Sequence, residues 1–295
     1  MSLSNGDKLK NGKYTIIGNP LGKGSYGTTY KARDHSSETN VAIKTLNKEV
    51  KHPDYENDLE RFTREITVLK KLSGHPNIVK YHDDFKENER HYLVMEFLSE
   101  ETLFTLVENE GALPDWLALD YIYQIGSALK ALHKKHWVHR DVYPKNIMIV
   151  KNKVQTKAVL IDFGIVKNRH LLTNEHPTNT YFTPYEQRYG NFDPKVDIYA
   201  LAACLYYALT AELPTPSVDR MRNEPLIPPR KHNPSISPKV EKAILRGMER
   251  EAKKRPQSMQ EWLNLLPKSK FWLWQQLIEV GQLIANCLNK FFQLT

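Results

Sequence analysis

Three glycines in the pattern G-x-G-x-x-G occupy positions 22, 24 and 27, between two segments that are rich in β-forming residues. Glycine allows a backbone to approach phosphates closely, and the amides of such a loop can donate to them. In the dinucleotide-binding form of this pattern a helix follows the glycines, and an acidic residue comes ~20 residues later. Here the strand-like segment Thr28–Ala32 follows, and a lysine, Lys44, ends the run VAIK. The context argues against a Rossmann turn and favours a glycine-rich hairpin over nucleotide phosphates.

The hydrophobic pattern changes near residue 99 from mainly strand-like to helical. Before that point the spacing predicts one helix, Leu59–Leu72. The predicted strands are Tyr14–Ile17, Thr28–Ala32, Val41–Leu46, Ile78–Tyr81 and Tyr92–Phe97, with a glycine-dense turn over Leu21–Gly27. Beyond residue 99 we expect helices at Asp115–His133 and over the uncharged run Ile198–Ala211, a hairpin of Ile147–Val150 with Val159–Ile161, a long loop over 165–195 and a proline-rich linker over 213–238. We therefore expect an α+β fold with two lobes.

Two short strings follow the glycines and Lys44 in a fixed order. The first is His139-Arg140-Asp141, with Asn146 five residues after the aspartate, and the second is Asp162-Phe163-Gly164. At an average usage near ~5% per residue type, a given tripeptide arises about once in ~8,000 positions. Over residues 14–266 the sequence resembles a protein kinase of the Ser/Thr type, most similar to the bacterial branch of the eukaryotic-like (Hanks-type) kinases.

The resemblance implies the bilobal protein kinase fold. Residues 1–98 would form the N-lobe, an antiparallel sheet plus one helix, and residues 99–267 a mainly helical C-lobe that carries the catalytic and activation loops. ATP and Mg²⁺ would bind between the lobes, and the γ-phosphoryl group would pass to Ser/Thr hydroxyls of proteins, the chain itself included. Residues 268–295 lie beyond the recognised fold.

The resemblance also assigns catalytic roles by position. Lys44 would hold the α- and β-phosphates and pair with Glu65 of the predicted helix. Asp162 and Asn146 would hold magnesium, which prefers hard oxygen ligands. Asp141 would accept or orient the proton of the attacking hydroxyl. Supporting positions would be Phe163 and His139 in a spine between the lobes, Asp197 holding the backbone of the catalytic loop, and Glu186 paired with Arg255.

The nucleotide pocket follows from the same resemblance. Its glycine-rich loop would contain Gly22, Gly24 and Gly27. The adenine would lie between apolar walls and pair with the backbone of a hinge. The wall and hinge positions are Leu21, Thr29, Ala42, Met95, Met148 and the hinge residues Glu96 to Leu98. Thr29 stands where valine is usual in the family.

The sequence departs from the family pattern near the substrate hydroxyl. Tyr143 replaces the lysine that is normally found two residues after the catalytic aspartate, and tyrosine cannot supply its fixed positive charge. Lys145 stands where tyrosine kinases place an arginine and could reach the same phosphate, which leaves dual specificity open. Asn179 replaces the usual threonine, unless the register shifts to Thr178 or Thr180. The alternative is therefore a nucleotide-binding pseudokinase that acts as a regulatory scaffold.

Composition narrows the remaining function classes. With 40% hydrophobic and 26% charged residues, the chain is neither disordered nor collagen-like. A formal charge of +8 is compatible with nucleic acid, but no RNA- or DNA-binding motif accompanies it, so we expect no nucleic-acid partner. Cys204 and Cys287 are isolated, and the N-terminus lacks an apolar signal region. These features predict a cytoplasmic protein.

The last 28 residues, 268–295, have an amphipathic helical pattern. Apolar residues recur at spacings of four and three, and glutamines and asparagines lie opposite. Three interpretations stay open: packing against the helical lobe, self-association or binding of a partner helix, and an in-plane membrane contact. The polar face lacks the Lys/Arg richness of membrane anchors, so membrane contact is not favoured.

Overall fold

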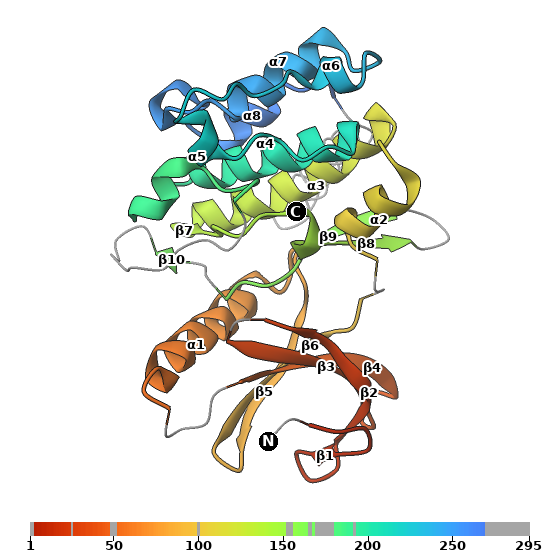
Figure 1. Cartoon of the computed structure of the whole chain (residues 1–295). Coiled ribbons are helices and arrows are strands. Elements are labelled where there is room, and N and C mark those ends of the chain that lie inside the picture. Colours follow the sequence, from red (N-terminus) through yellow and green to blue (C-terminus); the bar gives the residue numbers. More distant parts are fainter. Residues whose placement is uncertain are drawn as a thin grey trace, which may run out of the picture.

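The computed structural model describes residues 3–24, 26–47, 52–98, 101–151, 156–164, 167–168, 180–190 and 193–268. A twisted sheet and one long helix form one lobe, and a stack of helices forms the other (Figure 1). The hairpin β8–β9 and helix α2 lie where the two lobes meet (Figure 1). The expected α+β fold with two lobes is confirmed.

The sheet of the N-terminal lobe has six antiparallel strands in the order β1-β2-β3-β4-β6-β5. The strands are β1 (Lys8–Leu9), β2 (Tyr14–Lys23), β3 (Gly27–Asp34), β4 (Thr39–Leu46), β5 (Tyr81–Glu87) and β6 (Arg90–Glu96). Helix α1 (Tyr55–Leu72) connects β4 to the last two strands. Acidic residues lie in its first turn and lysines in its last, which suits the helix dipole.

Two details of the predicted sheet are wrong. The strand expected at Ile78–Tyr81 begins instead at Tyr81, and Ile78 forms only an isolated bridge with Leu160 of the other lobe. The charged segment after Tyr81 is strand β5, because half-exposed edge strands carry polar residues that mask their alternation. The glycine turn is also shorter than expected, since β2 continues through Lys23.

The second lobe contains the predicted helices and hairpin. Its longer helices are α2 (Leu103–Glu110), α3 (Asp115–Lys134), α4 (Lys195–Thr210) and α7 (Pro238–Gly247). The short helices are α5 (Ser217–Arg220), α6 (Pro229–His232) and α8 (Met259–Leu263), and the 3-10 turns are η1 (Pro144–Asn146), η2 (Tyr185–Tyr189) and η3 (Ala252–Lys254). The paired strands are β7 (Trp137–Val138) with β10 (Lys167–Asn168), and β8 (Ile147–Lys151) with β9 (Thr156–Leu160).

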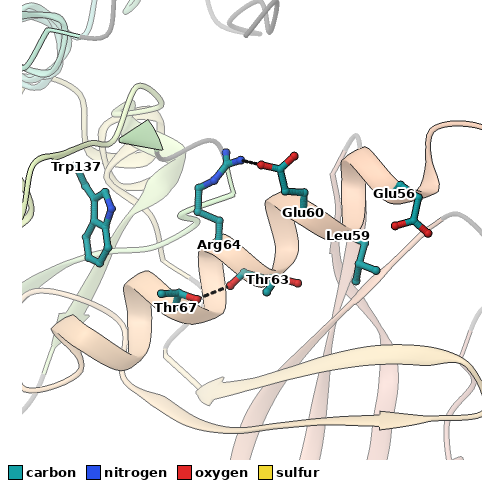
Figure 2. Close-up of a pocket in the computed structure, with 7 residues that line it drawn as sticks. All are labelled: Glu56, Leu59, Glu60, Thr63, Arg64, Thr67 and Trp137. Carbon is teal, nitrogen blue, oxygen red and sulfur yellow. Dashed lines mark hydrogen bonds and ion pairs between the residues drawn. The ribbon is translucent and has the colours of Figure 1, made fainter. Parts of the chain in front are cut away.

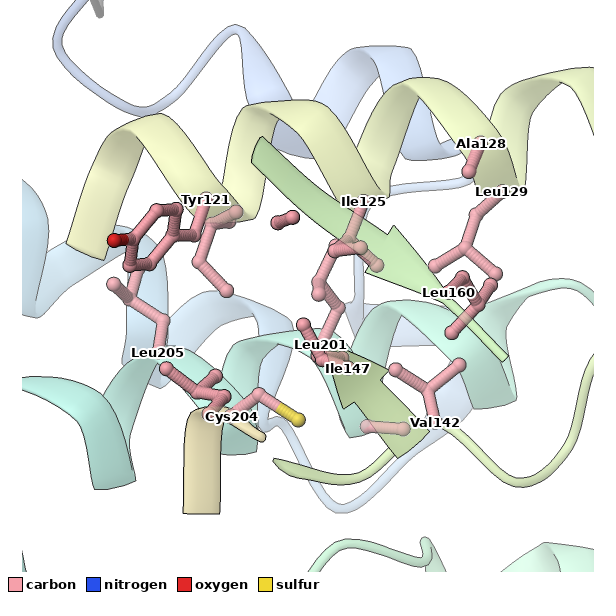
Figure 3. Close-up of a cluster of buried hydrophobic side chains, with 14 of the residues drawn as sticks. Tyr121, Ile125, Ala128, Leu129, Val142, Ile147, Leu160, Leu201, Cys204 and Leu205 are labelled. Atoms are coloured by element: carbon pink, nitrogen blue, oxygen red, sulfur yellow. The ribbon is translucent and has the colours of Figure 1, made fainter. Parts of the chain in front are cut away.

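Helices α3 and α4 form the centre of the C-terminal core. Every residue of α4 from Val196 to Thr210 is buried, which explains why this stretch is uncharged apart from Asp197. Figure 3 shows side chains of α4 packed with those of α3 and with Ile147 and Leu160 of the β8–β9 hairpin. The catalytic segment between α3 and β8 therefore rests on a rigid apolar base.

Several predictions fall outside the described residues: the amphipathic tail from residue 269 onward, Asn179, and residues 165–166, 169–179 and 191–192 of the loop predicted over 165–195. The lobe boundaries at residues 98 and 267 stay predictions. The Cys204 thiol is buried and free. In the part of the chain that the structure describes, no helix is long and apolar enough to cross a membrane.

Candidate active site

Lys44 joins three elements at the centre of the site. Its Nζ lies 2.9 and 2.8 Å from the two carboxylate oxygens of Glu65 on α1, and 3.0 Å from Oδ1 of Asp162. Burial alone would lower the pKa of Lys44, but the Asp162 and Glu65 carboxylates raise it well above its ordinary value. A fixed cation thus stands between strand β4, helix α1 and the segment after β9.

Asp141 and Asn146 lie at the two ends of the catalytic segment and bond to each other. Asn146 Nδ2 donates to the backbone oxygen of Asp141 at 2.9 Å and to its Oδ2 at 3.0 Å. Burial, and then the charge of Asp162, raise the pKa of Asp141 to about 7. A carboxylate with a pKa near neutrality suits a general base.

Asp197, at the start of α4, holds the backbone of the catalytic segment. Its Oδ2 accepts the amide of His139 at 2.9 Å and contacts His133 Nε2 at 2.7 Å, while its Oδ1 accepts the amide of Arg140 at 2.8 Å. Arg140 has a φ of 71°, an unfavourable conformation that these bonds maintain. The fully buried carboxylate therefore fixes the geometry next to Asp141.

Phe163 connects the two lobes beside this cluster. Its ring meets that of His139 edge-on, with centroids 4.9 Å apart, and its amide donates to Glu65 Oε1 at 3.4 Å. Both rings are buried. Helix α1, the catalytic segment and the Asp162 segment are therefore linked through one packed contact.

Glu186 and Arg255 make the expected ion pair. Arg255 Nη1 and Nη2 lie 2.5 and 3.1 Å from the two oxygens of Glu186, and the guanidinium is completely buried. The same guanidinium also donates to three backbone carbonyls, at Glu249, Lys195 and Arg250. The pair fixes the η2 segment on the helical lobe.

Tyr26, in the glycine-rich loop, has a position that sequence reasoning did not anticipate. Its hydroxyl donates to Asp162 Oδ1 at 3.1 Å and accepts from Lys44 Nζ at 3.2 Å, and its ring lies 4.8 Å from that ammonium. The side chain is 7% exposed. A Cβ on Gly164 would come within 1.1 Å of the hydroxyl, so a glycine at 164 makes room for it. The sequence places Tyr26 in the loop but gives no signal for its inward orientation.

The donor atoms of Asn146 and Asp162 fit a magnesium ion. The Asn146 amide nitrogen is engaged with Asp141, which leaves the amide oxygen as the ligand atom. The pKa of Asp162 lies below its ordinary value. Burial would raise this pKa, but the charge of Lys44 and the hydrogen bonds from Lys44, the Gly164 amide and Tyr26 outweigh burial and lower it. An ionised carboxylate and an amide carbonyl suit a hard cation.

The predicted nucleotide-pocket residues lie on adjacent strands and on β8. In the sheet register Gly22 lies opposite Thr29, Thr29 opposite Lys44, and Ala42 opposite Met95. Leu21 is 40% exposed at the end of β2, and Gly24 and Gly27 are joined by a backbone bond of 2.8 Å. The Glu96 amide donates to the Lys80 carbonyl, and Leu98 follows β6. Met148 forms an isolated β-bridge with Thr102.

Two of the residues that depart from the family pattern, Tyr143 and Lys145, line a separate pocket of 290 Å³. Lys145 Nζ lies over the ring of Phe104, 4.5 Å from its centroid. Lys44 and Asp162 do not line this pocket. Lys145 is thus oriented toward the helical lobe and not toward the Lys44 cluster.

Helix α1 also borders an open groove of 490 Å³. Glu65 is absent from its lining, which consists of Glu56, Leu59, Glu60, Thr63, Arg64, Thr67 and Trp137. Figure 2 shows the α1 residues along one side of the helix and Trp137 across from them, with Arg64 bonded to Glu60. The face of α1 that carries Glu65 is therefore distinct from this groove.

Comparison with known proteins agrees with this geometry. The family model of the protein kinase domain matches residues 15–265. A probable serine/threonine-protein kinase of Clostridium perfringens is 31% identical over 89% of this chain and 39% of its own length. Calcium-dependent protein kinase 5 of Plasmodium falciparum is 34% identical over 70% of this chain and 36% of its own length, and the Aurora kinase of Saccharomyces cerevisiae is 34% identical over 67% and 53%.

The chain thus spans between about a third and a half of the length of these relatives. The matched range contains the Lys44 cluster, the Asp141–Asn146 pair and the Glu186–Arg255 ion pair. Since the family model of the protein kinase domain covers most of the sequence, the chain belongs to the protein kinase family.

Proposed function

We propose that this protein is an ATP- and Mg²⁺-dependent kinase that phosphorylates Ser/Thr hydroxyls of proteins, itself included. The observation that carries the proposal is the Lys44 cluster, in which one buried ammonium contacts both Glu65 and Asp162. Phosphoryl transfer depends mainly on positioning and electrostatic stabilisation, and this cluster supplies a fixed charge at the junction of the lobes.

Each polar residue then has one role. Lys44 binds the α- and β-phosphates, and Glu65 orients it. Asn146 and Asp162 hold the metal. When bound, ATP and Mg²⁺ supply the phosphoryl group and neutralise its charge. Asp141 accepts the proton of the attacking hydroxyl, for which a pKa of about 7 is suitable.

The nucleotide base would occupy the pocket predicted from the sequence. Its proposed residues are Leu21, Gly22, Gly24, Gly27, Thr29, Ala42, Met95, Glu96, Leu98 and Met148. Support comes from the strand register, which aligns Ala42 with Met95 and Thr29 with Lys44. Phosphate binding also requires Tyr26 to move, because its hydroxyl already contacts the two groups, Lys44 and Asp162, that the phosphates and metal need.

A nucleotide-binding pseudokinase is the second candidate. Tyr143 has no fixed charge, since burial, and then the charges of Asp141 and Asp162, raise its pKa to about 12. Lys145 rests on Phe104, so its ammonium is not directed at the Lys44 cluster. These two observations favour a site with weakened transfer chemistry.

Phosphosite mapping separates the two candidates. Purified chain is incubated with Mg²⁺ and ATP, and its modified residues are identified by mass spectrometry, with Lys44→Met as the inactive control. A kinase acquires phosphoserine or phosphothreonine that is lost in the control. A pseudokinase binds the nucleotide but stays unmodified, and it modifies no added protein either.

A further inference from the structure

The 290 Å³ pocket lies beside the catalytic segment that contains Asp141, the proposed general base. Its lining residues favour some ligands over others. It is lined by Phe104, Tyr143, Lys145, Thr180, Tyr181, Phe182 and Leu213. Tyr143 and Lys145 are two of the four residues between Asp141 and Asn146, which are bonded at 3.0 Å. A protein segment that presents a hydroxyl to Asp141 therefore passes this pocket within a few residues of the acceptor.

The walls of the pocket are mostly aromatic and are fixed from behind. Phe104 stacks on Tyr207 of α4 with centroids 5.7 Å apart, and Phe182 meets the same ring edge-on at 6.1 Å. Tyr143 is partly buried and neutral. Such walls are suited to the apolar part of a side chain, and they exclude some of the water that would weaken a charge interaction.

Lys145 is the only charged group among the lining residues of this pocket. Its side chain is exposed, and its ammonium lies over the Phe104 ring. In the ranges that the structure describes, no carboxylate lies within ion-pair distance of it. Two acids on either side of Phe104 in the sequence, Glu101 and Glu110, pair with Lys151. The charge of Lys145 is therefore available to an anion that enters the pocket.

We infer that this pocket makes the kinase selective for acidic protein segments, with a carboxylate of Asp or Glu on Lys145 and its methylenes against Phe104 and Tyr143. The inference rests on the proposed function. A substrate lysine or arginine in the same position would be repelled by the positive charge of Lys145. Lys145 is then a specificity residue that contacts the substrate segment.

Three peptides test the preference. They share one serine acceptor and carry Glu, Gln or Lys at the three positions on either side. We expect kcat/KM to fall in the order Glu, Gln, Lys, with about tenfold or more between the first and last, as for one charge interaction near a protein surface. Lys145→Glu should reverse that order, and Lys145→Met should bring the Glu and Gln peptides together. Lys239→Glu, the same charge change on the exposed face of α7, should keep the wild-type order.

Two results would overturn the inference. In one, Lys145→Glu keeps the wild-type order. In the other, Lys145→Met lowers kcat/KM equally for all three peptides, which indicates a role at the phosphate. Peptide binding is measured in parallel by fluorescence anisotropy with a non-hydrolysable ATP analogue and Mg²⁺. If no peptide is phosphorylated, the proposed function fails, and the order of the binding constants still decides on the pocket.

Discussion

The position of Tyr26 makes a quantitative prediction about nucleotide affinity. In the described structure its hydroxyl bridges Lys44 and Asp162, so nucleotide binds only after the loop opens. Tyr26→Phe removes both hydrogen bonds but leaves Lys44 and Asp162 paired at 3.0 Å. The substitution therefore weakens the closed loop and leaves no buried charge without a partner.

The expected size follows from the two contacts. Hydrogen bonds to charged groups contribute roughly 1.5–3 kcal/mol, and lengths of 3.1 and 3.2 Å place these at the lower end. A loss of ~1.5 kcal/mol from the closed state corresponds to about tenfold in its population. Since apparent affinity scales with the fraction of open protein, the apparent Kd for nucleotide should fall by up to about tenfold.

Isothermal titration with a non-hydrolysable ATP analogue and Mg²⁺ measures this change. The control is Tyr30→Phe, which changes a buried tyrosine on β3 whose hydroxyl accepts the Leu3 amide at 3.2 Å. It should leave the Kd within about twofold of wild type. A Kd for Tyr26→Phe that equals that of the wild type, or is weaker, would refute the reasoning.

Gly164→Ala tests the same contact from the opposite side. Its Cβ would lie 1.1 Å from the Tyr26 hydroxyl, so the ring must leave. The affinity should rise in the same direction as for Tyr26→Phe. The double variant should show little further gain, because both changes remove one contact.

Three further predictions concern charge. Because the pKa of Asp141 is about 7, kcat/KM should fall about tenfold for each pH unit below that value, which a pH–rate profile measures; a flat profile would contradict the base role. Because the pKa of Asp141 is higher in the folded than in the unfolded protein, the ionised carboxylate destabilises the fold above pH 7. The unfolding free energy therefore rises as the pH falls from 7 toward 4. Asp141→Asn should thus raise the unfolding free energy by about 1–3 kcal/mol at pH 8, and by less at pH 5, in urea titrations. Glu186→Gln leaves the buried Arg255 guanidinium without its carboxylate and should lower the unfolding free energy by about 3 kcal/mol in the same assay, whereas a loss under ~1 kcal/mol would show that the pair is dispensable.

The chemistry-bearing residues were predictable because they lie in short, ordered strings. Asp141 with Asn146, and Lys44 with Glu65, are brought together as the resemblance implies. The body of helix α4 was predictable from composition, since the run from Ile198 onward has no charge and a helix buried on all sides is apolar all round.

Other features depend on packing that no local pattern encodes. Strand β5 carries polar residues on an edge, so its alternation is masked and its start was placed three residues early. The inward orientation of Tyr26 depends on the space above Gly164, and the contact of Lys145 with Phe104 joins segments forty residues apart. Such contacts arise from the tertiary fold and not from sequence spacing.

Transfer of labelled γ-phosphate tests the central proposal most directly. Purified chain is incubated with Mg²⁺, γ-labelled ATP and a protein acceptor, and label on serine and threonine is compared between wild type and Asp141→Asn. We predict incorporation by the wild type and near-complete loss in the variant, with nucleotide binding retained in both. Equal label in the two proteins, or no label from a wild type that binds the nucleotide, would contradict a kinase that uses Asp141 as its base.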